Sequence, residues 1–287
     1  MKKYKLKSYC KINLSLKVLK RLNSGYHNIT SLITFCNLHD EISISKIKGF
    51  KDKISFNGKF SIGIDEEKNT VTKVLNLLRN SKRLNNQNFK INIKKNIPHG
   101  SGLGGGSSNA ADILKYLNFK MKLKFNKSEL TKLASEIGSD VPICLEKKNT
   151  FLTGNKNKIL RLNQKFRLNV LIVYPNLICQ TKKIYKENKK FTLTKQAAIF
   201  KIKNKNKIVE FLKKENNDLE KTVVKFYPKV KEIIDFIKVQ NGCYFSRITG
   251  SGSACIGIFS NKKTANYARK IMKLKYPKYW FGVSKTM

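Results

Sequence analysis

Long apolar runs, paired cysteines and clustered histidines are missing from this sequence, and each absence excludes a class of protein. No apolar run in the 287 residues approaches the length that spans a bilayer, and no apolar segment of a secretory signal follows the lysine-rich N-terminus. The six cysteines are dispersed without a Cys-x-x-Cys pair, which predicts free thiols and a cytoplasmic protein. The three histidines lack metal-ligand spacing. We therefore expect no membrane partner and no metal site built from protein ligands.

Acidic side chains are also few: 18 Asp and Glu stand against 60 Lys and Arg, which gives a formal net charge of +42. Such a charge could indicate a nucleic-acid-binding surface. Here, however, it is spread along the whole chain together with many Asn and Ile, and the aromatic interleaving of a single-strand binder is not evident. We expect no specific nucleic-acid partner, and an RNA-binding protein is the alternative from a different class.

The most informative feature is a glycine-rich run between a predicted strand and a predicted helix. Alternating apolar residues predict the strand over 89–93, and apolar residues at i, i+3, i+4 and i+7 predict the helix over 110–117. Backbone amides in such a loop converge on an anion, most often a phosphate, and a helix N-terminus adds partial positive charge. A flexible linker would need neither neighbour. The run contains Gly100, Gly102, Gly104, Gly105 and Gly106, followed by Ser107, Ser108 and Asn109 as candidate N-caps.

Two common phosphate loops fit this run poorly. The Walker A loop needs Lys-Ser/Thr directly after its last glycine, whereas Ser107 and Ser108 follow Gly106 here. A dinucleotide site needs a tight strand-to-glycine turn and an acidic residue about twenty residues on. Pro98 interrupts that turn and no such acidic residue closes a second strand, so the Gly-x-Gly-x-x-Gly spacing carries little weight.

Hydrophobic periodicity predicts strands and helices without strict β-α-β alternation, which favours an α+β fold. Ser128 is the expected N-cap of one helix and Gly138 lies at its C-terminal end. A hairpin is expected to turn at Gly154 and Asn155, and we place a domain boundary near residue 155 although no linker marks it. The predicted strands cover residues 12–18, 31–35, 41–47, 89–93, 151–154, 159–162, 169–174, 255–259 and 281–284. The predicted helices cover residues 70–78, 110–117, 128–137, 230–237 and 264–274, and residues 181–215 are expected to form exposed helices and loops.

Asp140 and Lys11 have the best positions for chemistry on a bound phosphate. Asp140 follows a predicted helix end in a Gly-Ser-Asp-Val-Pro turn, and its spacing leaves two interpretations equally open. It is either a catalytic base or an N-cap for the segment after Pro142. Lys11 lies on the polar side of an apolar strand, although it is one of very many lysines. A lysine beside an aspartate could lower the pKa of a bound hydroxyl and stabilise the developing alkoxide.

Several short motifs resemble the GHMP kinase superfamily, and they occur in the family's order from residue 8 to residue 257. The glycine run resembles the family's phosphate loop, and residues 138–142 resemble its Gly-Ala/Ser-Asp-Val-Pro segment. Residues 249–252 resemble its third motif, and residues 217–220 resemble an Asn-Asp-Phe/Leu-Glu element. Residues 9–16 resemble the opening Pro-Ala-Lys-Ile-Asn-Leu-x-Leu, with Cys10 in place of alanine. Gly25, Tyr26 and His27 match a Gly-Tyr-His motif found in the branch of the superfamily that acts on a cytidine-linked alcohol.

The resemblance implies a two-domain α+β GHMP kinase fold. Its N-terminal domain, residues 1–155, would resemble domain 2 of ribosomal protein S5, and its C-terminal domain, residues 156–287, would be a ferredoxin-like α/β domain. The implied activity is ATP- and Mg²⁺-dependent phosphorylation of the 2-hydroxyl of a cytidine diphosphate-linked methylerythritol, in the non-mevalonate route to isopentenyl diphosphate. A kinase of the same fold acting on homoserine or mevalonate is the nearest alternative. The expected partner is this small molecule, and the expected state is a monomer or a weak homodimer.

The resemblance also implies a role for each matching residue. Lys11 and Asp140 would be the catalytic pair. The residues implied to bind ATP are Lys95, Pro98, Gly100, Gly102, Leu103, Gly104, Gly105, Gly106, Ser107, Ser108 and Asn109. The residues implied to bind the alcohol substrate are Asn13, Tyr26, His27, Thr181, Tyr185, Gly250, Ser251 and Gly252. Among these, His27 would form hydrogen bonds with the edge of the cytosine base, and Tyr26 and Tyr185 would pack on its face.

Overall fold

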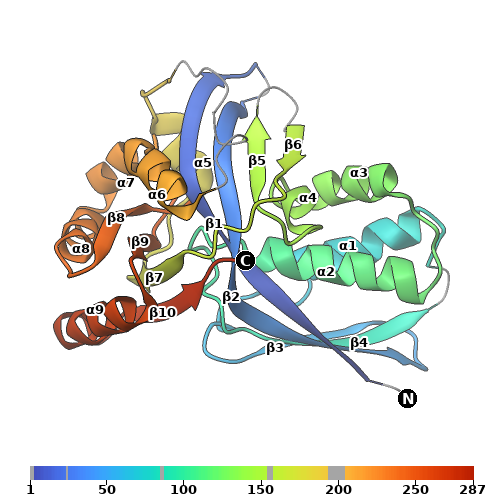
Figure 1. Ribbon diagram of the computed structural model, residues 1–287. Coiled ribbons are helices and arrows are strands. Elements are labelled where there is room, and N and C mark those ends of the chain that lie inside the picture. The colour runs from blue at the N-terminus through green and yellow to red at the C-terminus, as the bar shows by residue number, and fades with distance from the viewer. Residues whose placement is uncertain (1–2, 24, 85–86, 154–157, 193–203) are drawn as a thin grey trace. The chain divides into compact units, whose positions relative to one another are not determined.

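The chain forms two compact units in a computed structural model that describes residues 3–23, 25–84, 87–153, 158–192 and 204–287 (Figure 1). Unit 1 comprises residues 1–11, 38–99 and 104–147. Unit 2 comprises residues 12–37, 100–103 and 148–287. The units are discontinuous in sequence, so the predicted division at residue 155 stays a prediction. No helix in the described ranges is both long and apolar enough to cross a membrane.

Unit 1 contains the β3-β4-β2 end of a six-stranded sheet, with the C-terminal part of the long strand β2 (His27–Ile47). Residues 41–47 of β2 pair antiparallel with β4 (Asn88–Lys94), which pairs parallel with β3 (Lys53–Asn57). The side chains of Ile42, Ile44, Phe89, Ile91 and Ile93 alternate into the core, as the period of two in a strand requires. The helices of unit 1 are α1 (Thr70–Asn80), α2 (Gly105–Lys120), α3 (Lys127–Ile137) and α4 (Val141–Cys144).

The structure corrects two predictions, one for strand β2 and one for helix α3. Residues 31–35 and 41–47 are one continuous strand that includes His39 and Asp40. Helix α3 is capped by Asn126, not by Ser128, because Asn126 and Glu129 form a reciprocal capping box. Gly138 ends that helix with φ of 174°, which is extended backbone that any residue adopts. Strand β3 was not predicted at all, and helix 70–78 is confirmed as α1.

Unit 2 contains the first strands of the chain and a four-stranded sheet. Strand β1 (Tyr4–Arg21) pairs with β2, and β2 pairs through residues 31–33 with the hairpin of β5 (Thr150–Thr153) and β6 (Lys158–Arg161). The hairpin confirms the prediction, and its turn residues Gly154 and Asn155 lie outside the described residues. The other sheet has the antiparallel order β10-β7-β9-β8. Its strands are β7 (Asn169–Tyr174), β8 (Cys243–Ile248), β9 (Cys255–Phe259) and β10 (Trp280–Lys285).

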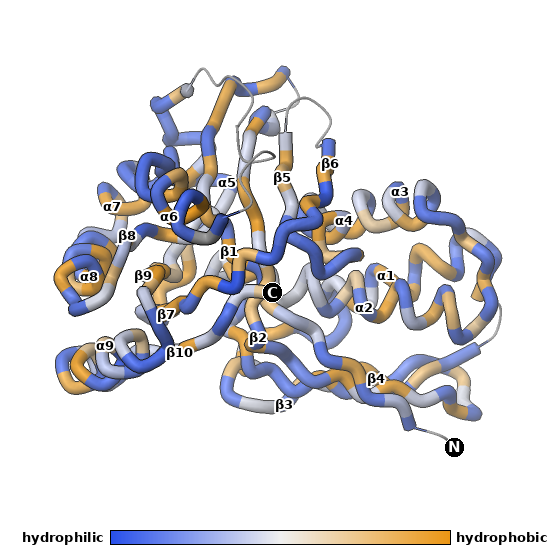
Figure 2. Tube along the Cα trace, in the orientation of Figure 1, coloured by the Kyte–Doolittle hydropathy of each residue, from blue (hydrophilic) through white to orange (hydrophobic). Residues whose placement is uncertain are grey.

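The helices of unit 2 give this sheet a ferredoxin-like arrangement, in which helices follow its first strand and a single helix precedes its last. The apolar sides of α8 and α9 pack with the sheet in one core cluster that includes Ile233, Ile237, Ala268 and Met272. Figure 2 shows hydrophobic and hydrophilic segments on both of these helices. The helices are α5 (Thr181–Glu187), α6 (Lys205–Lys214), α7 (Glu220–Phe226), α8 (Lys229–Lys238) and α9 (Lys262–Lys275).

Candidate active site

The glycine run of unit 1 leads directly into helix α2. Gly104 occupies the N-cap position with φ of 67° and ψ of 21°, and no side chain caps the helix. The prediction that Ser107, Ser108 or Asn109 would be the N-cap is therefore wrong, since all three lie inside the helix. A left-handed glycine makes the turn instead, which leaves first-turn amides without a side-chain partner. Such a helix start binds anions well.

The backbone of Gly104 lies against the stem of Lys11. A Cβ added at this position would meet Lys11 Cγ at 2.7 Å and Cε at 3.0 Å. The position therefore requires glycine for two reasons, its positive φ and the contact with a buried side chain. This contact also fixes where the lysine ammonium lies relative to the start of α2.

We predict that Gly104→Ala lowers kcat by about 10- to 100-fold, because the new methyl group must displace Lys11 and strain the turn. Steady-state kinetics with saturating ATP, the substrate that the resemblance implies, would measure the loss. Gly138→Ala is a matched control, because its Cβ would meet nothing closer than Val141 Cγ2 at 3.6 Å. Equal kinetics for the two variants would contradict this role of Gly104.

Lys11 and Asp140 meet in unit 1. Lys11 Nζ lies 3.1 Å from Asp140 Oδ2, and the two side chains are 4% and 40% exposed. Asp140 does occupy the N-cap position of α4, but its side chain forms no capping hydrogen bond. The side chain therefore pairs with Lys11 and does not cap α4, and its role as a catalytic base stays a prediction. The carboxylate is the more accessible member of the pair, as a base that receives a proton from a ligand must be.

Lys95 is almost fully buried beside the start of α2. A Cβ on Gly105 would lie 3.3 Å from Lys95 Nζ, so the ammonium is close to the first residue of the helix. Its partner is Asp40, which is fully buried on β2. Asp40 Oδ1 also accepts hydrogen bonds from the amides of Asn96 at 2.8 Å and Ile97 at 2.9 Å. One carboxylate thus holds both the lysine and the backbone that leads into the glycine run.

Sequence reasoning missed Asp40. A usable signal was present, because the chain has only 18 acidic residues and this one lies between two apolar strand segments. Buried carboxylates are rare unless they are paired.

Pro98 and His99 lie between Lys95 and the glycine run. Pro98 is buried, and burial together with Lys95 lowers the pKa of His99 below its usual value of 6.5.

In unit 2, the first part of the glycine run packs on a second glycine turn, residues 249–252. A Cβ on Gly102 would meet the carbonyl oxygen of Thr249 at 2.5 Å, which makes glycine necessary there. Leu103 is fully buried, and Gly100 is left-handed with φ of 64°. The amide of Ala254 donates to Ser101 O at 3.1 Å and so joins the two segments.

Several predicted substrate-binding residues surround the second glycine turn. Gly250 and Gly252 are left-handed, with φ of 58° and 80°. The hydroxyls of Thr181 and Ser251 lie 2.9 Å apart. The amide of Asn13 donates to Thr249 Oγ1 at 2.7 Å, and Asn13 Nδ2 donates to Ser31 Oγ at 2.7 Å. The structure therefore brings Asn13, Thr181 and residues 250–252 together.

Of the three residues predicted to bind the base, His27 and Tyr185 contact each other, and Tyr26 precedes His27 in the chain. The rings of His27 and Tyr185 have centroids 5.2 Å apart at 38°. Tyr26 is 71% exposed and follows Gly25, whose φ is 80° in the turn between β1 and β2. Burial, and to a smaller extent Arg21, lowers the pKa of His27 below 6.5. At neutral pH the ring is therefore neutral, with one donor and one acceptor nitrogen.

Among the described residues, no group of three or more His, Cys, Asp or Glu could hold a metal ion. The N-terminal part of α2 does contain an oxygen of the kind that Mg²⁺ prefers. Asn109 Oδ1 is buried and has no hydrogen-bond partner within the described ranges. The six cysteines are free, and burial raises the pKa of Cys144, Cys179 and Cys243 to about 11, so none of these three is poised as a nucleophile.

Comparison with known proteins agrees with this geometry. The N-terminal domain model of GHMP kinases matches residues 69–148, and the C-terminal model matches residues 199–278. These matches define the class: an ATP-dependent GHMP kinase. A 4-diphosphocytidyl-2-C-methyl-D-erythritol kinase of Pelagibacter ubique is 37% identical over 287 residues, with both chains covered completely. One of Caldicellulosiruptor bescii is 34% identical over 274 residues, with 94% of each chain covered. The chain belongs to the 4-diphosphocytidyl-2-C-methyl-D-erythritol kinase family.

Solved structures show the same fold. A 4-(cytidine 5'-diphospho)-2C-methyl-D-erythritol kinase superposes with a TM-score of 0.78 at 23% identity, covering 98% of this chain and 99% of the other. A homoserine kinase from Cytophaga hutchinsonii superposes with a TM-score of 0.75 at 17% identity, covering 100% of this chain and 95% of the other. The predicted GHMP kinase fold is confirmed.

Proposed function

We propose that this protein transfers the γ-phosphoryl group of ATP to the 2-hydroxyl of 4-diphosphocytidyl-2-C-methyl-D-erythritol, in the non-mevalonate pathway of isopentenyl diphosphate biosynthesis. One observation carries the proposal beyond family membership: the 3.1 Å contact between Lys11 and Asp140, with the lysine stem against Gly104 at the start of α2. A phosphate-binding helix start and a carboxylate paired with an ammonium are the protein groups that phosphoryl transfer to an alcohol requires.

In this proposal each candidate site residue of unit 1 has a defined role. The backbone from Gly104 to Asn109 binds the triphosphate of ATP, and Lys95 adds positive charge beside Gly105. Asp140 accepts the proton of the attacking hydroxyl. The Lys11 ammonium stabilises the negative charge that develops on the oxygen as the proton leaves.

Mg²⁺ would be held mainly by the phosphates of ATP. An oxygen near the start of α2, Asn109 Oδ1, is buried without a partner among the described residues and fits an oxygen-preferring ion. The ion would neutralise charge on the transferred phosphoryl group.

The proposed alcohol-binding residues lie in unit 2. The pair of His27 and Tyr185 and the exposed ring of Tyr26 supply flat surfaces for a pyrimidine. A neutral His27 matches the edge of cytosine, which presents an amino donor beside a ring-nitrogen acceptor. Asn13, Thr181, Gly250, Ser251 and Gly252 would hold the rest of this substrate.

We predict that KM for the cytidine-linked alcohol depends on the protonation of His27. Its pKa lies below 6.5, so KM should be constant above pH 7 and should rise as the pH falls through that pKa, since the protonated ring has no acceptor nitrogen. Loss of one hydrogen bond predicts a rise of about tenfold. Measuring KM for both substrates from pH 5 to 8 tests this. The KM of His27→Gln should lose the pH dependence, and an unchanged profile in that variant would exclude His27.

The function itself is tested by turnover of ATP with three acceptors side by side: the cytidine-linked alcohol, homoserine and mevalonate. We expect turnover with the first only. Turnover with another alcohol would retain Asp140 as the base and remove the cytidine roles of Tyr26, His27 and Tyr185. No turnover with any acceptor, together with steeply salt-dependent RNA binding, would favour the nucleic-acid alternative.

The remaining proposals concern the state of the protein. We propose a cytoplasmic enzyme, which the six free cysteines support. We further propose domains at 1–155 and 156–287, a monomer or weak homodimer, and no specific nucleic-acid partner.

A further inference from the structure

The tetrapeptide Asn217 to Glu220, which leads into the first residue of α7 in unit 2, directs three side chains to the backbone of other elements. Asp218 Oδ2 accepts a hydrogen bond from the amide of Val18 on β1 at 2.9 Å. Glu220 Oε2 accepts from the amide of Ile248 at the end of β8 at 3.0 Å. Asn217 Nδ2 donates to the carbonyl of Gly250 at 2.8 Å and to that of Ile248 at 3.3 Å.

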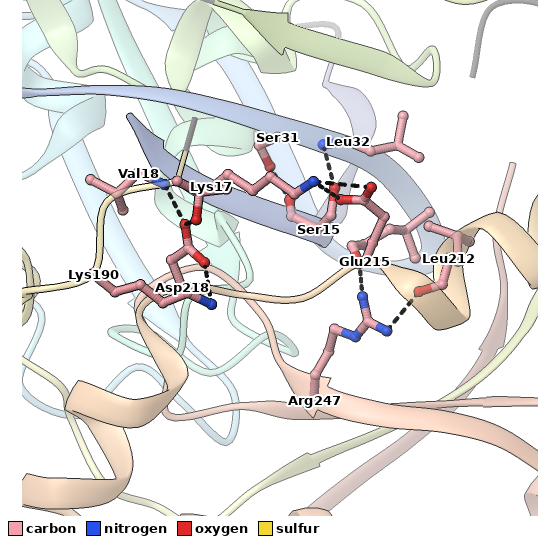
Figure 3. A network of polar contacts seen from close by, with 12 residues as sticks. Ser15, Lys17, Val18, Ser31, Leu32, Lys190, Leu212, Glu215, Asp218 and Arg247 are labelled. Atoms are coloured by element: carbon pink, nitrogen blue, oxygen red, sulfur yellow. Dashed lines mark hydrogen bonds and ion pairs between the residues drawn. The ribbon is translucent and has the colours of Figure 1, made fainter. Parts of the chain in front are cut away.

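The backbone of this segment runs beside β1 like a short added strand. The amide of Leu16 donates to Asn216 O at 3.0 Å, and the amide of Asp218 donates to Leu16 O at 2.8 Å. Figure 3 shows the side chains that reinforce the pairing, with Glu215 against Lys17 at 2.9 Å and Asp218 against Val18. The segment is therefore held in register with β1 independently of the Asn217 side chain.

Arg247 on β8 forms a second, independent set of hydrogen bonds, which joins β8 to β1 and α6. Its guanidinium donates to Leu14 O on β1 at 2.9 Å and to Leu212 O on α6 at 2.8 Å (Figure 3). Burial lowers the pKa of Arg247 to about 10, so it stays charged at neutral pH. The attachment of β8 to β1 and α6 does not need Asn217, whose direct contribution is to the glycine turn.

Asn217 is 5% exposed and uses both ends of its amide. Oδ1 accepts from the amide of Leu219 at 3.0 Å, while Nδ2 donates to the two carbonyls. The site needs a donor and an acceptor on one short side chain. An aspartate carboxylate of the same shape has no donor and would face two carbonyl oxygens.

The contact with Gly250 fixes the orientation of one peptide group in the glycine turn. In a planar trans peptide the carbonyl and the following amide point in opposite directions, so holding Gly250 O also sets the direction of the Ser251 N–H. Gly250 has φ of 58° and is free to adopt other conformations. The hydroxyl of Ser251 is held separately, 2.9 Å from Thr181 Oγ1.

We propose that Asn217 is a positioning residue for the alcohol substrate, acting through the peptide group between Gly250 and Ser251. The inference rests on the proposed function of residues 250–252 and extends it to a side chain outside the turn. Without the Asn217 side chain, the peptide group between Gly250 and Ser251 can rotate. The polar groups of the turn are then no longer preorganised in the orientation that binds the substrate.

The test compares Asn217→Ala with Glu220→Ala in steady-state kinetics and thermal unfolding. Both variants remove a side-chain contact with Ile248, but only Asn217 reaches Gly250. We expect Asn217→Ala to raise KM for the alcohol about tenfold and to leave KM for ATP within about twofold. Glu220→Ala should lower the unfolding midpoint and leave both KM values unchanged. Equal changes in both KM values, or an unchanged alcohol KM in Asn217→Ala, would overturn the proposal.

Asn217→Asp provides a second variant if the alanine variant does not fold. Its shape is retained, and it should raise the alcohol KM relative to the wild type at pH 8, because a carboxylate has no hydrogen to donate to the carbonyls of Ile248 and Gly250. Wild-type turnover is measured first. If the wild type turns over none of the alcohols, both proposals fail. If it turns over the cytidine-linked alcohol and both Asn217 variants match it, only the role of Asn217 is wrong.

Discussion

Asp140→Asn should reduce kcat by about 10³-fold while leaving the affinity for ATP nearly unchanged. The amide has almost the same shape as the carboxylate but cannot accept the proton of the attacking hydroxyl, and general base catalysis is worth about 10²- to 10⁴-fold. The side chain is 40% exposed and forms no capping bond in α4, so the amide, which can still accept a hydrogen bond from Lys11, should fit in place of the carboxylate. Steady-state turnover and calorimetric titration with ATP measure the two quantities.

Asp65→Asn is a matched control in the same unit, because Asp65 is exposed and its Oδ1, an oxygen that an amide retains, accepts from the backbone amides of Glu67 and Lys68. It should retain wild-type turnover. A double variant Lys11→Met with Asp140→Asn should be no slower than about the worse single variant, since residues that act as a unit are not additive. Full multiplicative loss would show that the two residues act independently, and wild-type activity in Asp140→Asn would remove Asp140 from the mechanism.

The parts of the fold that the sequence predicts well are those with strong local periodicity. The apolar runs of β7 and β9 give their bounds directly, because buried strands read as continuous hydrophobic segments. The glycine run was correctly placed between a strand and a helix, but its cap was assigned to side chains. Serine and asparagine are statistically better N-caps, whereas here a left-handed Gly104 beside a buried lysine makes the turn.

The candidate site was predictable in part, through motifs rather than geometry. Lys11 and Asp140 lie on a strand and in a helix-start turn far apart in sequence, and nothing local in the chain indicates that they meet. The same holds for Asp40, whose partner Lys95 is 55 positions away. Tertiary pairing of this kind is set by strand register, which single-sequence patterns do not reveal. Asn217 illustrates the same limit, since the motif was visible but its contact with Gly250 was not.

Asp40→Ala should destabilise the protein by about 3–5 kcal/mol, the cost of leaving one member of a buried ion pair without its partner. Lys95 is 2% exposed and Asp40 is fully buried, so water cannot replace the lost carboxylate. The amides of Asn96 and Ile97 lose their acceptor as well. Because a domain is stable by only about 5–15 kcal/mol, the shift in a urea unfolding midpoint should be large.

Asp52→Ala is the control for this prediction, because Asp52 also pairs with a cation and accepts from a strand amide. Its carboxylate lies 2.7 Å from Arg79 Nη1 and 2.9 Å from the amide of Phe89, but the pair is 15% and 30% exposed. Water can solvate the remaining arginine, so the expected loss is about 1–2 kcal/mol. Similar losses in the two alanine variants would contradict the argument from burial.

A double variant separates the buried charge from the lost acceptor. Asp40→Asn with Lys95→Met removes both charges, retains an oxygen for the amides of Asn96 and Ile97, and replaces the lysine stem by a side chain of similar length. Replacing a buried ion pair by well-packed neutral groups is often close to neutral, so the double variant should recover at least about half of the stability lost in Asp40→Ala. If it is as unstable as Asp40→Ala, the cost lies in packing and not in the unpaired ammonium. Recovery would instead identify Asp40 as the group that allows a charged lysine to remain buried at the first turn of α2.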